Sequence, residues 1–314
     1  MGVSIAQWAT YIAYVFVIVA YAWKVQKVVR KPLHLRWELY PVLHEKAHKY
    51  GGSYFEELDW WTKPRKKSYF ISAFHMLKNY LLFGEYFRKK RNYWVSLYPW
   101  HLGFYLIVFF HVMAFIGAVV IVTTEIEISA QSANAGGLLI FYLTLIVAVA
   151  SFILGAIGSI GMLITRLADR DLRNFAVPVN FFNYLFFLIV FLSGLFAWAL
   201  YDTGLGGYRE FWTGLITYKY VHTAAAEYTH IMLFSVFLIY LPFTRSTHYI
   251  TKIIAFFGIR SDDTPNIKGS GMADKINKLL DQKVSWSASH IRQGKSWKEQ
   301  VSGLPGDESK AEAK

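Results

Sequence analysis

Four histidines lie in otherwise apolar stretches of the sequence, where an imidazole ring needs a binding partner. His101 and His111 are ten residues apart in YPWHLGFYLIVFFHVMAF, residues 98–115. His230 and His248 are eighteen residues apart in and after a later apolar stretch. A polar ring inside a membrane segment is costly unless something binds it. Neutral imidazole can ligate a metal or haem iron, or relay protons.

Five apolar blocks must position these histidines. They lie near residues 5–23, 95–122, 137–165, 178–201 and 218–243. Each is long enough to cross a hydrocarbon core at about 1.5 Å per residue. The sequence therefore predicts an all-α, polytopic bundle of five transmembrane helices. The first block has no basic stretch before it and few small residues at its end, so we expect a retained anchor rather than a cleaved signal peptide.

The basic residues behind the formal charge of +12 gather at alternate ends of the apolar blocks, as expected for a multi-pass membrane protein. They give no indication of nucleic-acid binding. Connections 123–136 and 202–217 contain only one basic residue, Arg209. The other ends of the blocks are rich in basic residues: Lys24, Lys27, Arg30, Lys31, Arg36, Arg88, Lys89, Lys90, Arg91, Arg166, Arg170, Arg173, Arg245, Lys252 and Arg260. Because basic residues mark the cytoplasmic side, we expect a multi-pass inner-membrane protein with its N-terminus out and its C-terminus in.

Composition divides the chain into four segments: an anchor at 1–23, a cytoplasmic aromatic and basic segment at 24–94, a four-helix membrane core at 95–257 and a cytoplasmic tail at 258–314. The aromatic segment either caps the bundle or docks a cytoplasmic subunit, and these readings are compatible. We expect the last dozen or so residues to be disordered. The chain has no cysteine, which excludes disulfides, covalent haem attachment through CxxCH and cysteine-ligated iron–sulfur clusters on this chain.

The predicted helix directions place the four histidines at two levels. His101 and His248 form an inner pair, and His111 and His230 form an outer pair. Each pair offers the two axial imidazoles of a six-coordinate b-type haem. The spans differ, at about 15 Å on the second helix and about 27 Å on the fifth. Helix tilt and a kink at Pro242 are expected to absorb that difference.

Each candidate also has an alternative interpretation. A membrane histidine can serve as a helix–helix hydrogen bond or a proton relay. His222 competes with His230 for the outer ligand position, although its place near the outer surface suits a quinone site or a proton route better. Glu227 and Tyr228 are candidates for the same quinone or proton site, or for helix packing. Candidate contacts to the haem propionates, or to lipid headgroups, are Arg91, Arg166 and Arg245.

Five helices with histidines ten and eighteen residues apart resemble the gamma subunit of respiratory nitrate reductase, over about residues 1–255. That family of di-haem b cytochromes also includes membrane subunits of heterodisulfide-reductase-like complexes in sulfate reducers and methanogens. The insertion VRKPLHLRWELYPVLHEKAHKYGGSYFEELDWWTKP departs from the nitrate reductase subunit. It is similar to the cytochrome b subunit of the transmembrane redox (Tmc) complex and its Dsr relatives. Nitrate reductase also has a lysine near its quinone site, whereas this chain has no Lys or Arg from Asn92 to Thr165.

The resemblance implies two haem b groups ligated by the four histidines, a menaquinone site as a further candidate, a cytoplasmic iron–sulfur partner and a periplasmic multihaem cytochrome c. The predicted function is an electron-transfer subunit of an oxidoreductase complex, which carries electrons across the membrane. The alternative is a transporter or proton-channel subunit that uses the histidines as a relay, and a scaffold subunit is a third interpretation. A visible spectrum of the purified chain separates these classes.

Overall fold

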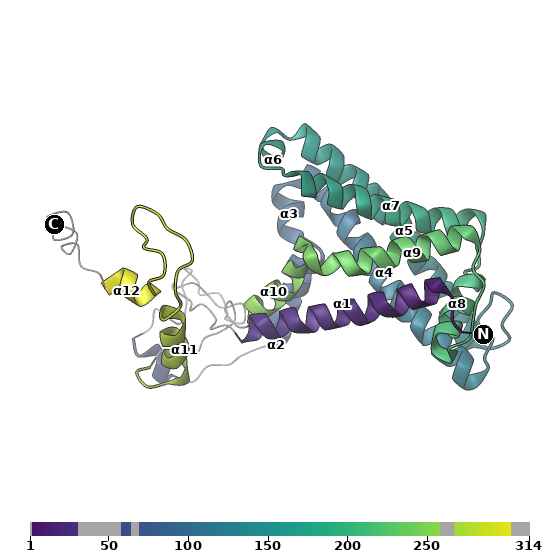
Figure 1. The fold of residues 1–314 in the computed structure, drawn as a ribbon, viewed down its shortest axis with the longest axis horizontal. Coiled ribbons are helices and arrows are strands. Elements are labelled where there is room, and N and C mark those ends of the chain that lie inside the picture. The colour runs from purple at the N-terminus through teal and green to yellow at the C-terminus, as the bar shows by residue number, and fades with distance from the viewer. Residues whose placement is uncertain (1, 31–57, 64–68, 258–266, 303–314) are drawn as a thin grey trace. The chain divides into compact units, whose positions relative to one another are not determined.

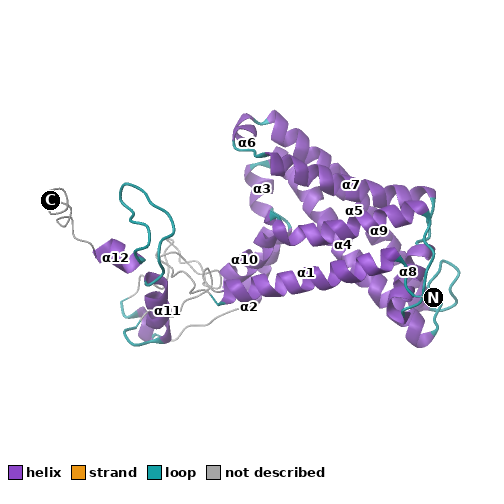
Figure 2. Cartoon of the chain, in the orientation of Figure 1, coloured by secondary structure: helices purple, strands orange, loops and turns teal. Residues whose placement is uncertain are grey.

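The computed structural model of this chain describes residues 2–30, 58–63, 69–257 and 267–302, and helices are its main secondary structure there (Figure 1). Figure 2 shows helices joined by loops. Within these ranges the only extended pairings are two isolated bridges, Lys283–Ser296 and Ala288–Ile291. Most of the aromatic segment, and the end of the tail where disorder was expected, lie outside the described residues.

Five helices are long and apolar enough to cross a membrane. They are α1 (Ile5–Val29), α4 (Arg91–Thr124), α5 (Ala135–Ala168), α7 (Pro178–Leu200) and α9 (Ala225–Tyr240). The fifth span continues from α9 through the 3-10 turn η4 to Phe243. The prediction of an all-helical chain with five candidate membrane spans is confirmed. The shorter helices are η2 (Trp60–Thr62), α2 (Tyr69–Met76), η3 (Leu77–Leu81), α3 (Gly84–Lys89), α6 (Arg170–Asn174), α8 (Gly206–Thr217), η4 (Leu241–Phe243), η5 (Arg245–Thr247), α10 (His248–Ala255), α11 (Gly271–Leu280) and α12 (Trp297–Ser302).

The chain divides into two compact units. One comprises residues 1–21 and 78–246, and the other comprises residues 22–77 and 247–314. The first unit, which we call the membrane unit, therefore holds four complete candidate spans and most of α1. The boundaries of these units, near residues 21, 77 and 246, differ from the boundaries at 23, 94 and 257 that composition indicated.

Helices α4 and α5 pack backbone to backbone through glycine. A Cβ atom on Gly103 would lie 2.4 Å from the amide nitrogen of Gly155, and one on Gly158 would lie 2.2 Å from the amide nitrogen of Trp100. The Ser151 hydroxyl donates to the carbonyl of Gly103 at 3.0 Å. Small residues let membrane helices approach closely, and hydroxyl groups join them. This contact fixes the axial register of α4, which carries two of the four histidines.

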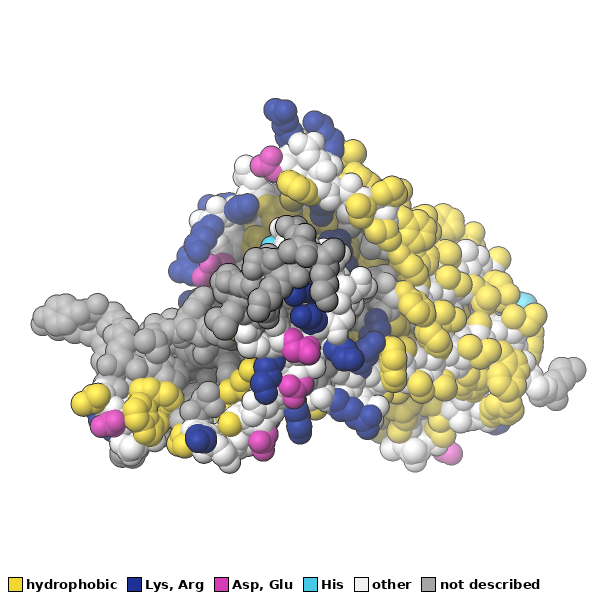
Figure 3. All heavy atoms as spheres, turned by 60° about the vertical axis from the view of Figure 1, so that its left-hand side comes forward, with side chains coloured by type: hydrophobic (Ala, Val, Ile, Leu, Met, Phe, Trp, Pro, Cys, Tyr) yellow, Lys and Arg dark blue, Asp and Glu magenta, His cyan; other side chains and the backbone are white. Residues whose placement is uncertain are grey.

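Apolar side chains fill the centre of the membrane unit and also cover its outside. Phe110, Phe152, Phe187, Phe191 and Phe237 belong to one buried cluster. On the face drawn in Figure 3, hydrophobic side chains spread over the membrane helices. In water such a surface would drive aggregation, whereas lipid tails solvate it, so the surface agrees with membrane insertion.

The fifth span begins later than predicted, although it ends at Phe243 as expected. Residues 206–217 form the separate helix α8, and α9 begins only at Ala225. At the other end α9 stops at Tyr240 and is followed by the 3-10 turns η4 and η5 before α10 begins at His248. Pro242 lies in η4, where its ring cannot donate the hydrogen bond that a continuing α-helix needs. The break is larger than the expected kink, so five regular helical turns do not connect His230 with His248.

The second unit contains α2, α10, α11 and α12. Ser270 caps α11 by accepting from the amide of Ala273 at 3.2 Å. A hairpin between α11 and α12 pairs the amide of Val284 with the carbonyl of Lys295 at 2.9 Å. Residues 267–302 of the tail are therefore folded.

Candidate functional site

The structure brings together the outer histidine pair, His111 of α4 and His230 of α9. Both rings are buried, with exposed fractions of 7% and 5%. The ring of Phe234 lies between them in contact: its centroid is 4.1 Å from that of His111 and 6.2 Å from that of His230. Two imidazoles from different membrane helices thus share one aromatic core. The sequence predicted this meeting, because His111 and His230 were expected at the same depth in the membrane.

The hydrogen bonds of His111 define which ring nitrogen carries the proton. Its Nδ1 lies 2.7 Å from the carbonyl oxygen of Ile107. A carbonyl can only accept, so Nδ1 donates and Nε2 keeps its lone pair. That lone pair accepts from the Tyr208 hydroxyl at 2.9 Å. Burial raises the pKa of the Tyr208 phenol, so this hydroxyl keeps its proton and acts as the donor.

His230 is held in the same tautomer by a different route. Its Nδ1 lies 2.9 Å from the Ser193 hydroxyl, and that hydroxyl donates its single hydrogen to the carbonyl of Val190 at 2.8 Å. Ser193 therefore accepts from His230, which places the proton on Nδ1. The Nε2 of His230 is buried and has no hydrogen-bond partner among the described residues. An unsatisfied buried lone pair is costly, so this nitrogen is available to a ligand.

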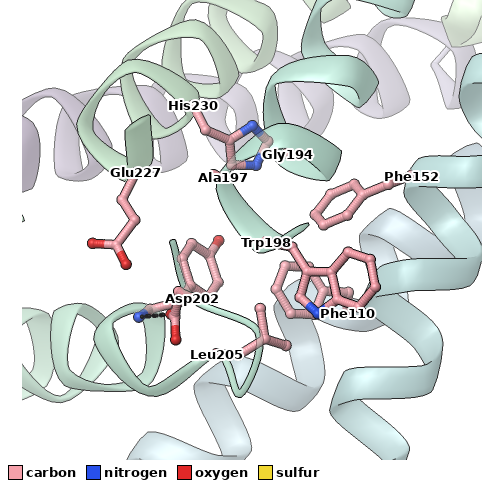
Figure 4. Close-up of a pocket in the computed structure, with 10 residues that line it drawn as sticks. Phe110, Phe152, Gly194, Ala197, Trp198, Asp202, Leu205, Glu227 and His230 are labelled. Atoms are coloured by element: carbon pink, nitrogen blue, oxygen red, sulfur yellow. Dashed lines mark hydrogen bonds between the residues drawn. The ribbon is translucent and has the colours of Figure 1, made fainter. Parts of the chain in front are cut away.

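A small cavity opens beside His230 at the junction of α7, α8 and α9 (Figure 4). Aromatic and small residues line most of it, and two carboxylates complete the lining. The lining residues are Phe110, Phe152, Gly194, Ala197, Trp198, Asp202, Leu205, Tyr208, Glu227 and His230. In Figure 4 the carboxylate of Glu227 projects from α9 towards the same space as the His230 ring.

The three quinone or proton candidates fall into different environments. Glu227 lines the cavity and also accepts from the amide of Ala224 at 3.2 Å, which caps the first turn of α9. Tyr228 is exposed, and His222 is exposed in the non-helical stretch before α9. Only Glu227 therefore shares the cavity with His230. The structure places His230, rather than His222, beside His111.

The inner pair is divided between the two units. His101 lies in α4, where its Nδ1 is 2.9 Å from the carbonyl of Leu97, so it too carries its proton on Nδ1. Its ring packs on that of Phe83 at 4.6 Å. His248 begins α10 in the second unit and is exposed. The pairing of His101 with His248 stays a prediction.

The three candidate arginines also differ. Arg166 donates to the carbonyl of Leu172 at 3.3 Å, while its Nε is buried with no hydrogen-bond partner among the described residues. Arg91 begins α4 and lies over the ring of Phe87 at 5.0 Å. Arg245 is exposed in η5. Arg166 is therefore the arginine with a donor left for a buried carboxylate.

Sequence reasoning missed the residues that orient the outer histidines. Ser193 and Tyr208 lie 37 and 97 residues from the histidines they bond, and neither spacing is a recognisable motif. Asp202 is the residue that could have indicated α8 from the sequence. In the structure its carboxylate accepts hydrogen bonds from the amides of Gly206 and Tyr208 at 2.7 and 3.1 Å. Such a carboxylate before an amphipathic stretch is a helix-start signal.

Arg209 was noted only for its charge, yet it is buried. It donates to the carbonyl of Gly204 and lies over the ring of Phe141 at 5.1 Å. Burial lowers its pKa from the usual value, and the neighbouring charge of Asp202 opposes that shift. The residue therefore anchors α8, which holds Tyr208 against His111.

The donor nitrogens of His111 and His230 are of the type that a b-type haem uses, but Phe234 stacks on the His111 ring, so haem binding stays a prediction. Such a haem needs two neutral imidazole nitrogens, and metal-ligating histidines usually donate the other ring N–H to a carbonyl or another acceptor. His111 and His230 meet both conditions, although iron at His111 would have to replace the Tyr208 hydroxyl. No three His, Asp or Glu side chains gather as a site for a bare metal ion within the described ranges.

Comparisons of the chain with protein-family models, curated proteins and solved structures gave no match. The fold and site define a multi-pass helical protein with a buried histidine pair. The resemblance to di-haem cytochromes stays a prediction from the histidine spacing and the insertion.

Proposed function

We propose that this chain is a di-haem b-type cytochrome, the membrane subunit of a respiratory redox complex. One observation carries the proposal: His111 and His230 share a buried core, and hydrogen bonds hold both as Nδ1–H tautomers with Nε2 lone pairs turned away from the backbone. The Nε2 of His230, buried without a hydrogen-bond partner among the described residues, is a nitrogen that an iron ligand bond would satisfy.

In this proposal the protein orients the ligands and excludes water. Ile107 and Ser193 fix the two imidazoles, and their hydrogen bonds make each ring a stronger ligand. Phe110, Phe152 and Phe234 surround the rings with apolar surface. A bound haem would supply a one-electron redox centre inside a medium that does not solvate charge, with a potential set by these ligands and by burial.

His101 would contribute to a second haem, with His248 as the expected partner. Two buried donors near this part of α4 support a carboxylate-bearing ligand there. The Trp100 Nε1 and the Arg166 Nε are buried without hydrogen-bond partners among the described residues. Trp100 contacts both His101 and Tyr184, and Arg166 donates to the Tyr184 hydroxyl at 3.5 Å. A propionate would satisfy such donors.

The distribution of charge supports an orientation with the N-terminus out and the C-terminus in. Ser96 near the start of α4 bonds Thr165 near the end of α5 at 3.1 Å, so the basic residues beside them lie at one end of the membrane unit. The connection 125–134 at the other end of these helices has no Lys or Arg. In this proposal the basic ends face the cytoplasm and the outer histidine pair lies towards the periplasm of an inner membrane.

Electrons need partners on both sides, because the chain has no cysteine for an iron–sulfur cluster. We assign the cytoplasmic partner to an iron–sulfur subunit of the heterodisulfide-reductase type, docked through residues 24–93. A menaquinone pool or a periplasmic multihaem cytochrome c would exchange electrons with the outer haem. Glu227, in the cavity beside His230, is the residue placed to take a quinol proton.

Haem analysis of the purified chain tests the proposal. A pyridine haemochrome assay should find two acid-extractable haem b groups per chain, and His230→Ala should remove one. His222→Ala is the matched control, because His222 is exposed and eight residues away, and it should keep both. A chain without haem, or loss of the haem from His222→Ala alone, contradicts the proposal.

A proton relay is the second candidate function. The Tyr208 hydroxyl bonds His111, and Tyr208, Glu227 and His230 line one cavity, which is an arrangement that could pass protons. This function predicts a haem-free chain whose reconstituted vesicles leak protons, with the leak abolished in His111→Ala. Haem in stoichiometric amount, with no proton flux, rules it out.

A further inference from the structure

Exposed tyrosine and tryptophan side chains are unevenly distributed over the membrane unit. Among its described residues seven such side chains are exposed, and six of them lie towards one end of the spans. This is the end at which Figure 1 shows α8 and the N-terminus. The seventh, Tyr86, lies in α3, which precedes the start of α4. We call the six the aromatic girdle: Trp8, Tyr142, Tyr201, Tyr218, Tyr220 and Tyr228, with exposed fractions from 39% to 61%.

The girdle is spread over α1, α5, the end of α7, the start of α9 and the connection after α8. Tyr218 ends α8, and its ring lies 6.2 Å from that of Trp8. The side-chain amide of Gln7 donates to the carbonyl of Lys219 at 2.8 Å and accepts from the backbone amide of Val221 at 3.4 Å. These bonds hold the connection beside the first turns of α1.

Contacts around the buried histidine pair give the levels of two girdle members. The ring of Tyr14 lies 6.4 Å from that of His111, and Trp8 is six residues nearer the start of the same helix. At 1.5 Å per residue, Trp8 lies about 9 Å beyond the histidine pair along the bundle. Tyr228 precedes His230 in α9 by two residues, so it lies about 3 Å beyond the pair on the same side.

Two glycine contacts give the levels of two further members. A Cβ on Gly117, six residues beyond the histidine of α4, would lie 3.5 Å from the side chain of Ile140, which puts Tyr142 about 6 Å beyond the pair. A Cβ on Gly194 would lie 2.8 Å from the histidine ring of α9, and Tyr201 follows seven residues later, about 10 Å beyond the pair. The four levels fall within a band about 7 Å wide. The headgroup layer on each side of a bilayer is about 5–7 Å thick.

We propose that the aromatic girdle lies in the interfacial layer at one surface of the membrane, and that the hydrocarbon core begins near the level of Tyr142. Tyrosine and tryptophan favour this layer because their rings are apolar while their polar ends reach water. Deeper on α5 the exposed side chains include Ile146, Ile153 and Ile157, which suit hydrocarbon.

Lipid is favoured over a docked protein because the girdle comes from four candidate spans, whereas a docked protein covers one side of a bundle. The proposal places the buried histidine pair only about 6 Å below the hydrocarbon boundary. It needs only that the spans cross a membrane, so it is independent of the haem proposal.

Single-cysteine spin labels along α5 test this placement, because the chain has no cysteine of its own. Leu139→Cys, Ile146→Cys and Ile153→Cys leave the girdle intact, at positions that are 67%, 64% and 40% exposed. They lie about 4 Å beyond Tyr142 and about 6 and 16 Å below it. Gln131→Cys, exposed in the connection before α5, is the water-facing control. The labelled full-length chain is reconstituted in phosphatidylethanolamine–phosphatidylglycerol vesicles, and collision rates with oxygen and with a water-soluble nickel chelate are measured.

The ratio of oxygen to nickel collisions should be low at 131 and 139, higher at 146 and highest at 153. Circular dichroism should show unchanged helicity in each variant. A ratio at 139 as high as that at 146 overturns the proposal, because the hydrocarbon core would then begin at the start of α5. A ratio at 146 as low as that at 131 also overturns it, because the girdle would then stand in water and be free for a protein partner.

Discussion

Replacing Gly194 by alanine adds one methyl group at the contact between α7 and the His230 ring. The new Cβ would lie 2.8 Å from the Cε1 of His230 and 2.5 Å from the Cε1 of Phe152. Ordinary contacts of this kind are 3.4–4 Å, so the histidine ring must move by at least about 0.6 Å, or the helices must separate. Gly194 therefore sets the position of the proposed ligand.

The size of the effect follows from two limits. Overpacking a well-packed core costs about 1–3 kcal/mol. Binding sites tolerate displacements of only about 0.5 Å. If the whole cost falls on the haem-bound state, the affinity of the outer site for haem falls by roughly 5- to 150-fold. The inner haem should stay, because the atoms nearest the added Cβ belong to Phe152 and His230, and neither residue is assigned to that haem.

The assay compares Gly194→Ala with Gly204→Ala, whose Cβ meets nothing within 4 Å. Both variants are purified in detergent, and haem content, reduced-minus-oxidised spectra and haem retention against apomyoglobin are measured. Gly194→Ala should lose about one haem of two or show a faster loss, and Gly204→Ala should match the parent chain. Unchanged retention in Gly194→Ala would refute the packing argument. A parent chain without haem would refute the proposed function instead, and thermal denaturation would still measure the packing cost.

Three further changes test other parts of the structure. Tyr208→Phe removes the hydroxyl that donates to the Nε2 of His111. The haem-free variant should therefore lose about 1–3 kcal/mol of unfolding free energy in denaturant titrations. The control is Tyr201→Phe, at an exposed tyrosine, which should lose almost none. Gly158→Ala forces a Cβ to within 2.2 Å of the backbone of Trp100 and should separate α4 from α5, which would show as lost folded yield beside an unaffected Gly204→Ala. Deleting residues 31–57 of the docking segment, which leaves α1, Phe83 and Arg91 in place, should abolish co-purification of the cytoplasmic subunit while both haems remain, and continued co-purification would contradict the docking role of that part.

The parts of the fold that sequence could predict are those set by long-range composition. The blocks that became α4, α5 and α7 needed only length and apolarity, because a membrane span is defined by the solvent around it. The start of α9 was predicted seven residues early, because Tyr218, Tyr220 and Val221 were counted with the apolar block although Lys219 and His222 lie among them. In the structure Tyr218 adopts a left-handed φ of 57° and ends α8. Hydropathy does not report such backbone geometry.

Helical periodicity predicted which site residues lie at the same depth. It could not predict hydrogen bonds between residues that only the tertiary structure brings together. The meeting of His111 with His230 follows from helix direction and depth alone. The roles of Ser193 and Tyr208 do not, because each bond joins residues on different helices through one rotamer. For His248 the 3-10 turns at and after Pro242 interrupt the regular helical phase on which its predicted alignment with His230 relied, so its pairing with His101 stays a prediction.

The hydrogen bond between His111 and Tyr208 also limits when the outer site can form during synthesis of the chain. Tyr208 follows His111 by 97 residues, so at about 5–20 residues per second the ribosome supplies it roughly 5–20 seconds later. During that interval α4 enters the bilayer with the Nε2 of His111 unsatisfied by its later partners. His230 comes later still, in the last of the five candidate spans. The outer site can therefore be completed only after His230 has been synthesised, and until then α4 lies in the bilayer without its later partners.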